Sequence, residues 1–174
     1  MRDEAAFVEF AEAVRGKLRR TAYLLCGDWD QASDHVQEGL IRVYVAWPRL
    51  TRAGREYAYA RKAVVSAFLD HARRRSSTEV AAEPDRDVPS GQDVAESVAL
   101  RTALMSALTA LPSRQRACVV LRYFDDLSVA DTAAVLGCTE GTVKSQTSRA
   151  LASLRSTFEG SPIGGLAAEG ATPW

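Results

Sequence analysis

The sequence predicts an all-α protein of two small helical domains, over residues 3–75 and 96–157, joined by a flexible acidic linker over residues 76–95. Alanine, leucine and arginine dominate the composition and runs of β-branched residues are short, which favours helix over strand. Apolar residues recur with a helical period from Ala5 almost to Phe158. A chain of 174 residues with 47% hydrophobic residues is long enough to bury two cores.

The first helix with a functional pattern spans residues 32–47, ASDHVQEGLIRVYVAW. Its apolar stripe is expected to face the core and consists of Val36, Leu40, Val43, Tyr44 and Trp47. The opposite face combines charged residues with aliphatic ones: Asp34, Gln37, Glu38, Ile41, Arg42 and Val45. Aliphatic side chains framed by acids predict a surface for a partner that offers basic residues around an apolar patch. The alternative is an ordinary solvated helix face with salt pairs.

The second functional helix spans residues 57–75, YAYARKAVVSAFLDHARRR. Its buried side is expected to consist of Ala60, Val64, Val65, Phe68 and Ala72. The other side presents a polar row with flanking cations: Tyr59, Lys62, Ser66, Asp70 and Arg73. An aromatic ring, a hydroxyl and a carboxylate bordered by cations can stack an unpaired base, hydrogen-bond its edge and hold its phosphate. The closing arginines, Arg73, Arg74 and Arg75, are expected to clamp phosphate or to complement the helix dipole.

Charge is distributed unevenly along the chain, although the formal net charge is zero. Residues 1–75 carry a net charge of +4 and residues 101–158 one of +3, while residues 76–100 carry −5. The acidic segment contains Pro84 and Pro89 and lacks an apolar period, which is typical of a flexible linker. Residues 158–174 are rich in Gly, Ala and Pro and are expected to form a disordered tail.

Residues 127–150, LSVADTAAVLGCTEGTVKSQTSRA, predict a helix-turn-helix. Ser128 and Asp131 form a capping-box pair that begins the first helix. Gly137 can take the left-handed conformation that ends this helix, and Thr139 is a good N-cap for the second. The two helices are expected to pack through Ala130, Ala133, Ala134 and Leu136 on the first, and through Val143, Thr147, Ala150, Leu151 and Leu154 on the second.

The outer face of the second helix is polar and positive without being bulky. It consists of Thr142, Lys144, Ser145, Gln146, Ser148 and Arg149. Such a face can enter a major groove and hydrogen-bond base edges. The spacing of polar residues alone is equally compatible with a solvated face on a core helix. The turn pattern that precedes the helix favours a DNA-binding face.

Other function classes find little support in the sequence. Cys26, Cys118 and Cys138 are widely spaced among apolar residues, and His35 and His71 do not pair with them at zinc spacing. The sequence therefore predicts no metal and no cofactor, and it lacks a phosphate loop or a nucleophile with its base. It predicts a protein that is not an enzyme, spans no membrane and is cytoplasmic.

Three motifs occur along the chain: AxDxVQE over residues 32–38, YxxARxxxVSxxxDxxRRR ending at Arg75, and LxxLPSRQRxCVVLRYFxxLSxxxTAxxLGCxxGTVKSxxSRALxxLR over residues 108–155. Together they resemble the motifs of bacterial sigma factors of the extracytoplasmic-function group, most closely those of its SigE-like subgroup. The resemblance implies a transcription initiation factor that binds core RNA polymerase, at the clamp of the largest subunit and the flap of the second, and directs it to promoter DNA. The resemblance is also compatible with an anti-sigma factor as a further partner.

The resemblance also implies roles for individual residues. Polymerase docking falls to Asp34, Gln37, Glu38 and Ile41; recognition and melting of the −10 element fall to Tyr59, Lys62, Ser66, Asp70, Arg73, Arg74 and Arg75. Recognition of the −35 element falls to Arg122, Thr142, Lys144, Ser145, Gln146, Ser148 and Arg149. The family often has Trp at Tyr59 and Asn at Ser66, and commonly Arg at Gln146, so the preferred base and the phosphate attraction are expected to differ here.

Two alternatives share parts of these motifs. A LuxR-like helix-turn-helix regulator would bind DNA without joining the polymerase, but it should also carry a domain with strands. A degenerate sigma paralogue would still dock on polymerase without opening promoters, and Ser66 and Gln146 are the residues that keep this alternative open.

Overall fold

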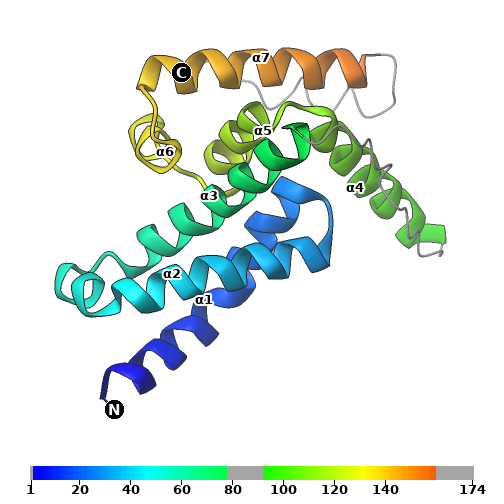
Figure 1. Ribbon diagram of the computed structural model, residues 1–174. Coiled ribbons are helices and arrows are strands. Elements are labelled where there is room, and N and C mark those ends of the chain that lie inside the picture. Colours follow the sequence, from blue (N-terminus) through cyan, green and yellow to red (C-terminus); the bar gives the residue numbers. More distant parts are fainter. Residues whose placement is uncertain (1, 78–91, 160–174) are drawn as a thin grey trace.

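The computed structural model describes residues 2–77 and 92–159, and these residues form helices and connecting turns without a strand (Figure 1). The elements in chain order are α1 (Arg2–Cys26), α2 (Trp29–Ala53), α3 (Glu56–Ser77), α4 (Gln92–Ala110), α5 (Ser113–Val119), the π-helix η1 (Val120–Phe124), α6 (Val129–Leu136) and α7 (Glu140–Phe158). The all-α prediction is confirmed.

Helices α1, α2 and α3 form the N-terminal domain, in which α2 packs against both neighbours (Figure 1). Asp28 caps the start of α2 by accepting a hydrogen bond from the Gln31 amide at 2.7 Å, and Gly54 ends it with a φ of 61°. Helix α2 approaches α3 closely at Gly39, where an added Cβ would lie 2.6 Å from a methyl group of Val64. A small residue at this point lets the two helices carry their functional faces side by side.

The predicted apolar stripe of α2 is confirmed with one correction. Val36, Leu40, Val43 and Trp47 are buried, but Tyr44 is 52% exposed. Its ring packs edge-to-face with that of Phe7, with centroids 4.9 Å apart. The stripe was predicted too wide because the contact with Phe7 of α1 leaves Tyr44 about half exposed.

The C-terminal domain consists of α4 to α7, with α7 lying across its outer edge (Figure 1). The Ser128 hydroxyl accepts from the Asp131 amide at 3.0 Å, Gly137 has a φ of 62°, and Thr139 accepts from the Thr142 amide at 3.1 Å. These three signals confirm the predicted helix-turn-helix.

The predicted packing face of α6 needs correction. Ala130 and Ala134 are exposed, while Thr132, Ala133 and Leu136 are buried. The predicted buried face of α6 is rotated relative to the observed one because α6 packs against α3 as well as α7. These contacts bury the side of the helix that includes Thr132. On α7, Val143, Thr147 and Ala150 are buried as predicted, and Leu151 and Leu154 are half-buried.

The two domains share one buried cluster, which we call the interdomain core. Leu25 from α1 and Val65 and Phe68 from α3 pack against residues of α5, η1, α6 and α7. Among the latter are Cys118 and Leu121, both almost fully buried. Burial of this apolar surface favours the packed arrangement of the domains.

Two polar side chains reinforce the interdomain core. Asp125 accepts a hydrogen bond from Thr21 Oγ1 at 2.8 Å, and its second oxygen lies 3.2 Å from Arg61 Nε. Arg116 donates to the backbone oxygens of Leu25, Thr109 and Leu111, so one guanidinium joins α1 to the α4–α5 connection. No pattern in the sequence predicted these contacts.

The described ends of the predicted linker are helical, since α3 continues to Ser77 and α4 begins at Gln92. The remainder of the predicted linker, residues 78–91, and the predicted tail from residue 160 onward lie outside the described residues. Of the helices that the structure describes, none combines the length and the apolar character needed to cross a bilayer.

Candidate nucleic-acid interface

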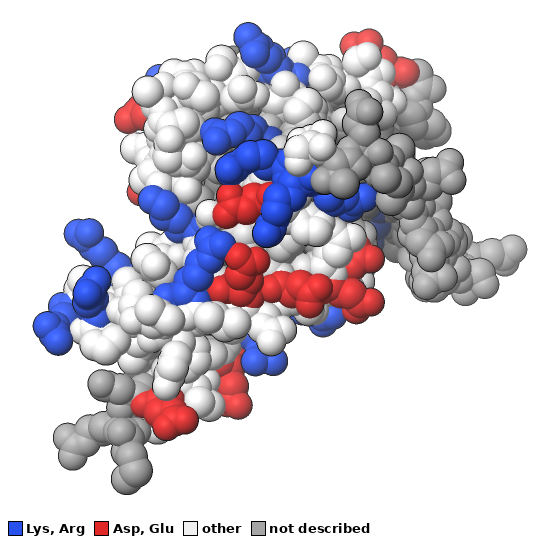
Figure 2. Space-filling model, viewed as in Figure 1, with Lys and Arg blue, Asp and Glu red and all other residues white. Residues whose placement is uncertain are grey.

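The outer face of α2 is acidic and partly apolar, as predicted. Asp34 and Gln37 are exposed, and Ile41 is 57% exposed. Glu38 is half-buried because its carboxylate pairs with Arg42 one turn later. Figure 2 shows acidic side chains gathered in a band across the middle of this face of the molecule, with basic side chains above the band.

An apolar groove of about 740 Å³ runs beside this face, between α1 and α2. Phe7 and Val8 line it from α1, and Gln37, Ile41 and Tyr44 line it from α2. The part of the groove that α1 contributes was not predicted. The exposed Val8, at 48%, was the available signal, because an aliphatic residue on the outer side of an amphipathic helix often marks a contact surface.

The polar row of α3 is displayed as predicted on a side of the helix that the interdomain core leaves uncovered. Tyr59 is 37% exposed, Lys62 is exposed and Ser66 is half-buried. Arg73, Arg74 and Arg75 are exposed in the last turns of α3. An aromatic ring and cations on an accessible helix face suit contact with unpaired bases and phosphates.

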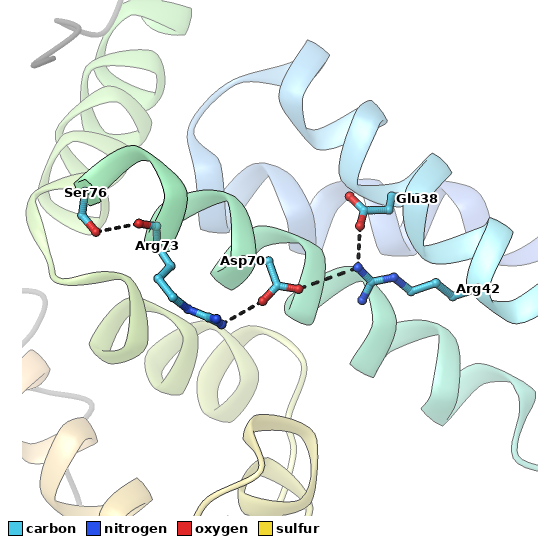
Figure 3. Close-up of polar contacts among 5 residues, drawn as sticks. All are labelled: Glu38, Arg42, Asp70, Arg73 and Ser76. Atoms are coloured by element: carbon cyan, nitrogen blue, oxygen red, sulfur yellow. Dashed lines mark hydrogen bonds and ion pairs between the residues drawn. The ribbon is translucent and has the colours of Figure 1, made fainter. Parts of the chain in front are cut away.

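Asp70 is held between two arginines from different helices (Figure 3). One carboxylate oxygen accepts a hydrogen bond from Arg73 at 2.8 Å, and the other lies 3.7 Å from Arg42 of α2. Because Arg42 also pairs with Glu38, four side chains form a continuous chain from the face of α2 to the end of α3. The sequence placed Glu38 and Asp70 in separate sites, and the structure brings these sites together.

The outer face of α7 is also accessible. Lys144, Ser145, Ser148 and Arg149 are exposed. Thr142 and Gln146 are half-buried, and the Thr142 hydroxyl lies 2.9 Å from that of Thr139. Thr142 therefore takes part in the cap at the N-terminus of α7 and also presents a hydroxyl at the edge of the outer face.

A second cavity, of about 370 Å³, lies between η1 and α7. Its lining includes Arg122, Lys144, Ser148 and Arg155 and no acidic residue. Arg122 donates to the backbone oxygen of Leu127, which orders the start of the helix-turn-helix. Arg155 was not predicted; its spacing of eleven from Lys144, three helical turns, was the signal that could have placed both on one face.

His35 lies beneath the acidic face of α2, 4% exposed, with its ring 5.4 Å from that of His71 and 6.1 Å from that of Phe68. Burial and the neighbouring His71 lower the pKa of His35 below its usual value of 6.5. Protonation therefore favours the unfolded state, in which the imidazole is hydrated. The described residues contain no group of His, Cys, Asp and Glu suited to hold a metal ion.

We expect the free energy of unfolding to fall as the pH drops below 6.5, because the unfolded chain then binds a proton that folded His35 resists. The slope is at most about 1.4 kcal/mol per pH unit, the value for one proton. Urea unfolding at several pH values measures it. In His35→Phe this part of the slope should vanish; an unchanged slope would assign the pH dependence to other groups.

Two family models match the chain in its two domains. "Sigma-70 region 2" matches residues 10–78 and "Sigma-70, region 4" matches residues 101–154. The RNA polymerase sigma-E factor of Streptomyces avermitilis is 37% identical over 93% of this chain and 92% of that protein. The chain belongs to the extracytoplasmic-function group of the sigma-70 family. The predicted SigE-like resemblance is confirmed.

Other relatives of this sigma factor agree with the assignment. The RNA polymerase sigma-E factor of Streptomyces coelicolor is 38% identical over 85% of both chains, and the sigma factor SigM of Mycobacterium tuberculosis is 33% identical over 87% of this chain and 76% of its own. Among solved structures, RpoE of Bartonella quintana, in complex with the anti-sigma factor NepR, shares the fold with a TM-score of 0.66 at 24% identity, over 88% of this chain and 97% of that one.

The predicted function in transcription initiation is thereby confirmed at the level of the family, and the LuxR-like regulator is not favoured. Sigma factors of this family are not generally catalytic.

Proposed function

We propose that this sigma factor docks on the clamp of core RNA polymerase through Asp34, Gln37, Glu38 and Ile41 of α2. The exposed acids suit a basic partner surface, and Ile41 beside the α1–α2 groove suits an apolar side chain at its centre. The groove widens the contact to α1. The cytoplasmic location that we propose for the protein is compatible with this partner.

In the proposed complex α3 engages the −10 element. Tyr59 stacks on an unpaired base, Ser66 and Asp70 hydrogen-bond its edge, and Lys62, Arg73, Arg74 and Arg75 contact the phosphates. Support comes from the exposure of this face while the opposite side of α3 is buried in the interdomain core. A serine at position 66 offers a single hydroxyl, so fewer base edges are distinguished than an amide would distinguish.

The outer face of α7 binds the −35 element in the same proposal. Lys144, Ser145, Ser148 and Arg149 enter the major groove, while Arg122, Thr142 and Gln146 lie toward the DNA backbone. The positive lining of the η1–α7 cavity supports a phosphate contact beside the recognition helix. Both domains together supply the binding energy for duplex opening, which costs roughly a few kcal/mol per unstacked base.

The observation that carries this proposal is the simultaneous exposure of three faces, on α2, α3 and α7. It is tested by transcription from a sheared genomic library with purified core polymerase, with and without the protein, followed by sequencing of transcript 5′ ends. Initiation at a shared two-element motif only with the protein is the expected result. Core binding without initiation would identify a degenerate paralogue, and absence of core binding would overturn the proposal.

We expect Glu38→Lys to weaken association with core polymerase at least about tenfold, because it places a cation where the proposed partner surface is basic. Association is measured by fluorescence anisotropy of the labelled full chain. Glu12→Lys, an equal charge change at an exposed position of α1, is the control and should bind like the wild type. If the two variants bind core polymerase with equal affinity, the docking surface does not lie on α2.

A further inference from the structure

The chain of ion pairs from Glu38 to Arg73 joins the face proposed to bind polymerase to the face proposed to bind promoter DNA (Figure 3). Arg42 is its central member and has no role in the proposed function so far. Its Nη2 atom pairs with Glu38 on its own helix and lies 3.7 Å from Asp70 on α3. One cation therefore serves two carboxylates that belong to different surfaces.

The side chains in this chain are too accessible for the ion pairs to matter much for stability. Those of Glu38, Arg42 and Asp70 are 43%, 36% and 37% exposed, and that of Arg73 is 75% exposed. Exposed ion pairs contribute little to folding because water screens them. For the same reason they exchange partners at low cost when a new charge arrives.

The geometry sets the direction of such an exchange. Arg73 is retained by Asp70 at 2.8 Å, and it stands in the last turns of α3 where phosphates are proposed to bind. The second oxygen of Asp70 lies 3.7 Å from Arg42. When a basic group of the polymerase pairs with Glu38, Arg42 loses the closer of its two carboxylates. Its charge then becomes available to Asp70.

We propose that Arg42 is a positioning residue that couples polymerase docking to DNA binding. Occupation of Glu38 shifts Arg42 onto Asp70, which neutralises this carboxylate and releases Arg73 to contact a phosphate. Docking thus adds about one phosphate contact to the DNA interface. This inference rests on the proposed function, since it takes the docking role of α2 as given.

The test uses the full chain bound to purified core polymerase and a short, labelled, mixed-sequence single-stranded DNA as the probe. Affinity is measured over a range of salt concentrations, because each phosphate contact on a single strand contributes about 0.7 to the slope of log affinity against log salt. Core affinity and thermal stability are measured on the same samples. Arg42→Gln is expected to bind core but to show a slope shallower by about 0.7, since Arg73 stays on Asp70.

Two further variants separate this mechanism from a loss of structure. Arg42→Gln/Asp70→Asn should regain the wild-type slope, because the carboxylate that retains Arg73 is gone. Arg42→Lys keeps a cation between the carboxylates and should also keep the wild-type slope. Arg20→Gln, at an exposed position of α1, removes an equal charge away from the chain of ion pairs and should change nothing.

A wild-type slope in Arg42→Gln would overturn the coupling, and so would a double variant that stays as shallow as the single one. Either result, obtained with normal core affinity, leaves the proposed function standing. Failure of the wild-type chain to bind core would instead overturn the proposed function, and the coupling with it.

Discussion

Arg116→Met is expected to lower the free energy of unfolding by about 3 kcal/mol. The guanidinium donates to three backbone oxygens, and its charge lies 5.7 Å from the centre of the Phe68 ring. Methionine keeps much of the apolar volume but has no donor, so three carbonyl groups lose their partner at about 1–3 kcal/mol each before water recovers a part. Burial also lowers the pKa of Arg116, which marks a cation held away from water.

Urea denaturation of the full chain, followed by tryptophan fluorescence, measures this loss. Arg114→Met is the matched control, because Arg114 is exposed on the same helix two residues earlier and should tolerate the change within about 0.5 kcal/mol. Equal stability of the two variants would show that water replaces the three lost hydrogen bonds, and that Arg116 does not hold the domains together.

Asp125→Asn is expected to cost about 3 kcal/mol, the loss typical of a buried ion pair that keeps only one charged partner. The side chains of Asp125 and Arg61 are 6% and 11% exposed, so water does not screen Arg61 once the carboxylate is gone. The amide can still accept the hydrogen bond from Thr21. The change therefore removes the charge and little else.

Asp126→Asn provides the control for this second prediction. Asp126 is exposed and has a φ of 53°, a conformation that asparagine tolerates as well as aspartate. Its unfolding free energy should stay within about 0.5 kcal/mol of the wild type. The double variant Arg61→Met/Asp125→Asn tests the ion pair directly. If its loss of unfolding free energy equals the sum of the losses in the two single variants, the two side chains do not interact and the assigned ion pair is wrong.

The features that the sequence predicted are those that depend on residues close together in the chain. Ser128, Gly137 and Thr139 act within one turn of their own position, so the helix-turn-helix followed from local chemistry. The exposed Ile41 followed from helical period alone. These features need no knowledge of how the domains pack.

The features that escaped prediction all depend on contacts between distant segments. Thr21 and Asp125 meet across 104 residues, and nothing in either local pattern marks the other as a partner. The pairing of Arg42 with Asp70 depends on the register of α2 against α3, which is set by the close approach at Gly39. Tyr44 was assigned to the core because the pattern of its own helix does not reveal how much of the side chain α1 covers.

The contact between Thr21 and Asp125 has a consequence for the order of synthesis. The ribosome adds about 5–20 residues per second, so the 104 residues from Ala22 to Asp125 take about 5–20 s to make. Once Phe68 has been made, the nascent chain holds Leu25, Val65 and Phe68 without the later helices that cover them. These apolar side chains are therefore expected to stay accessible to chaperones and proteases until the chain has been made up to Val143 of α7.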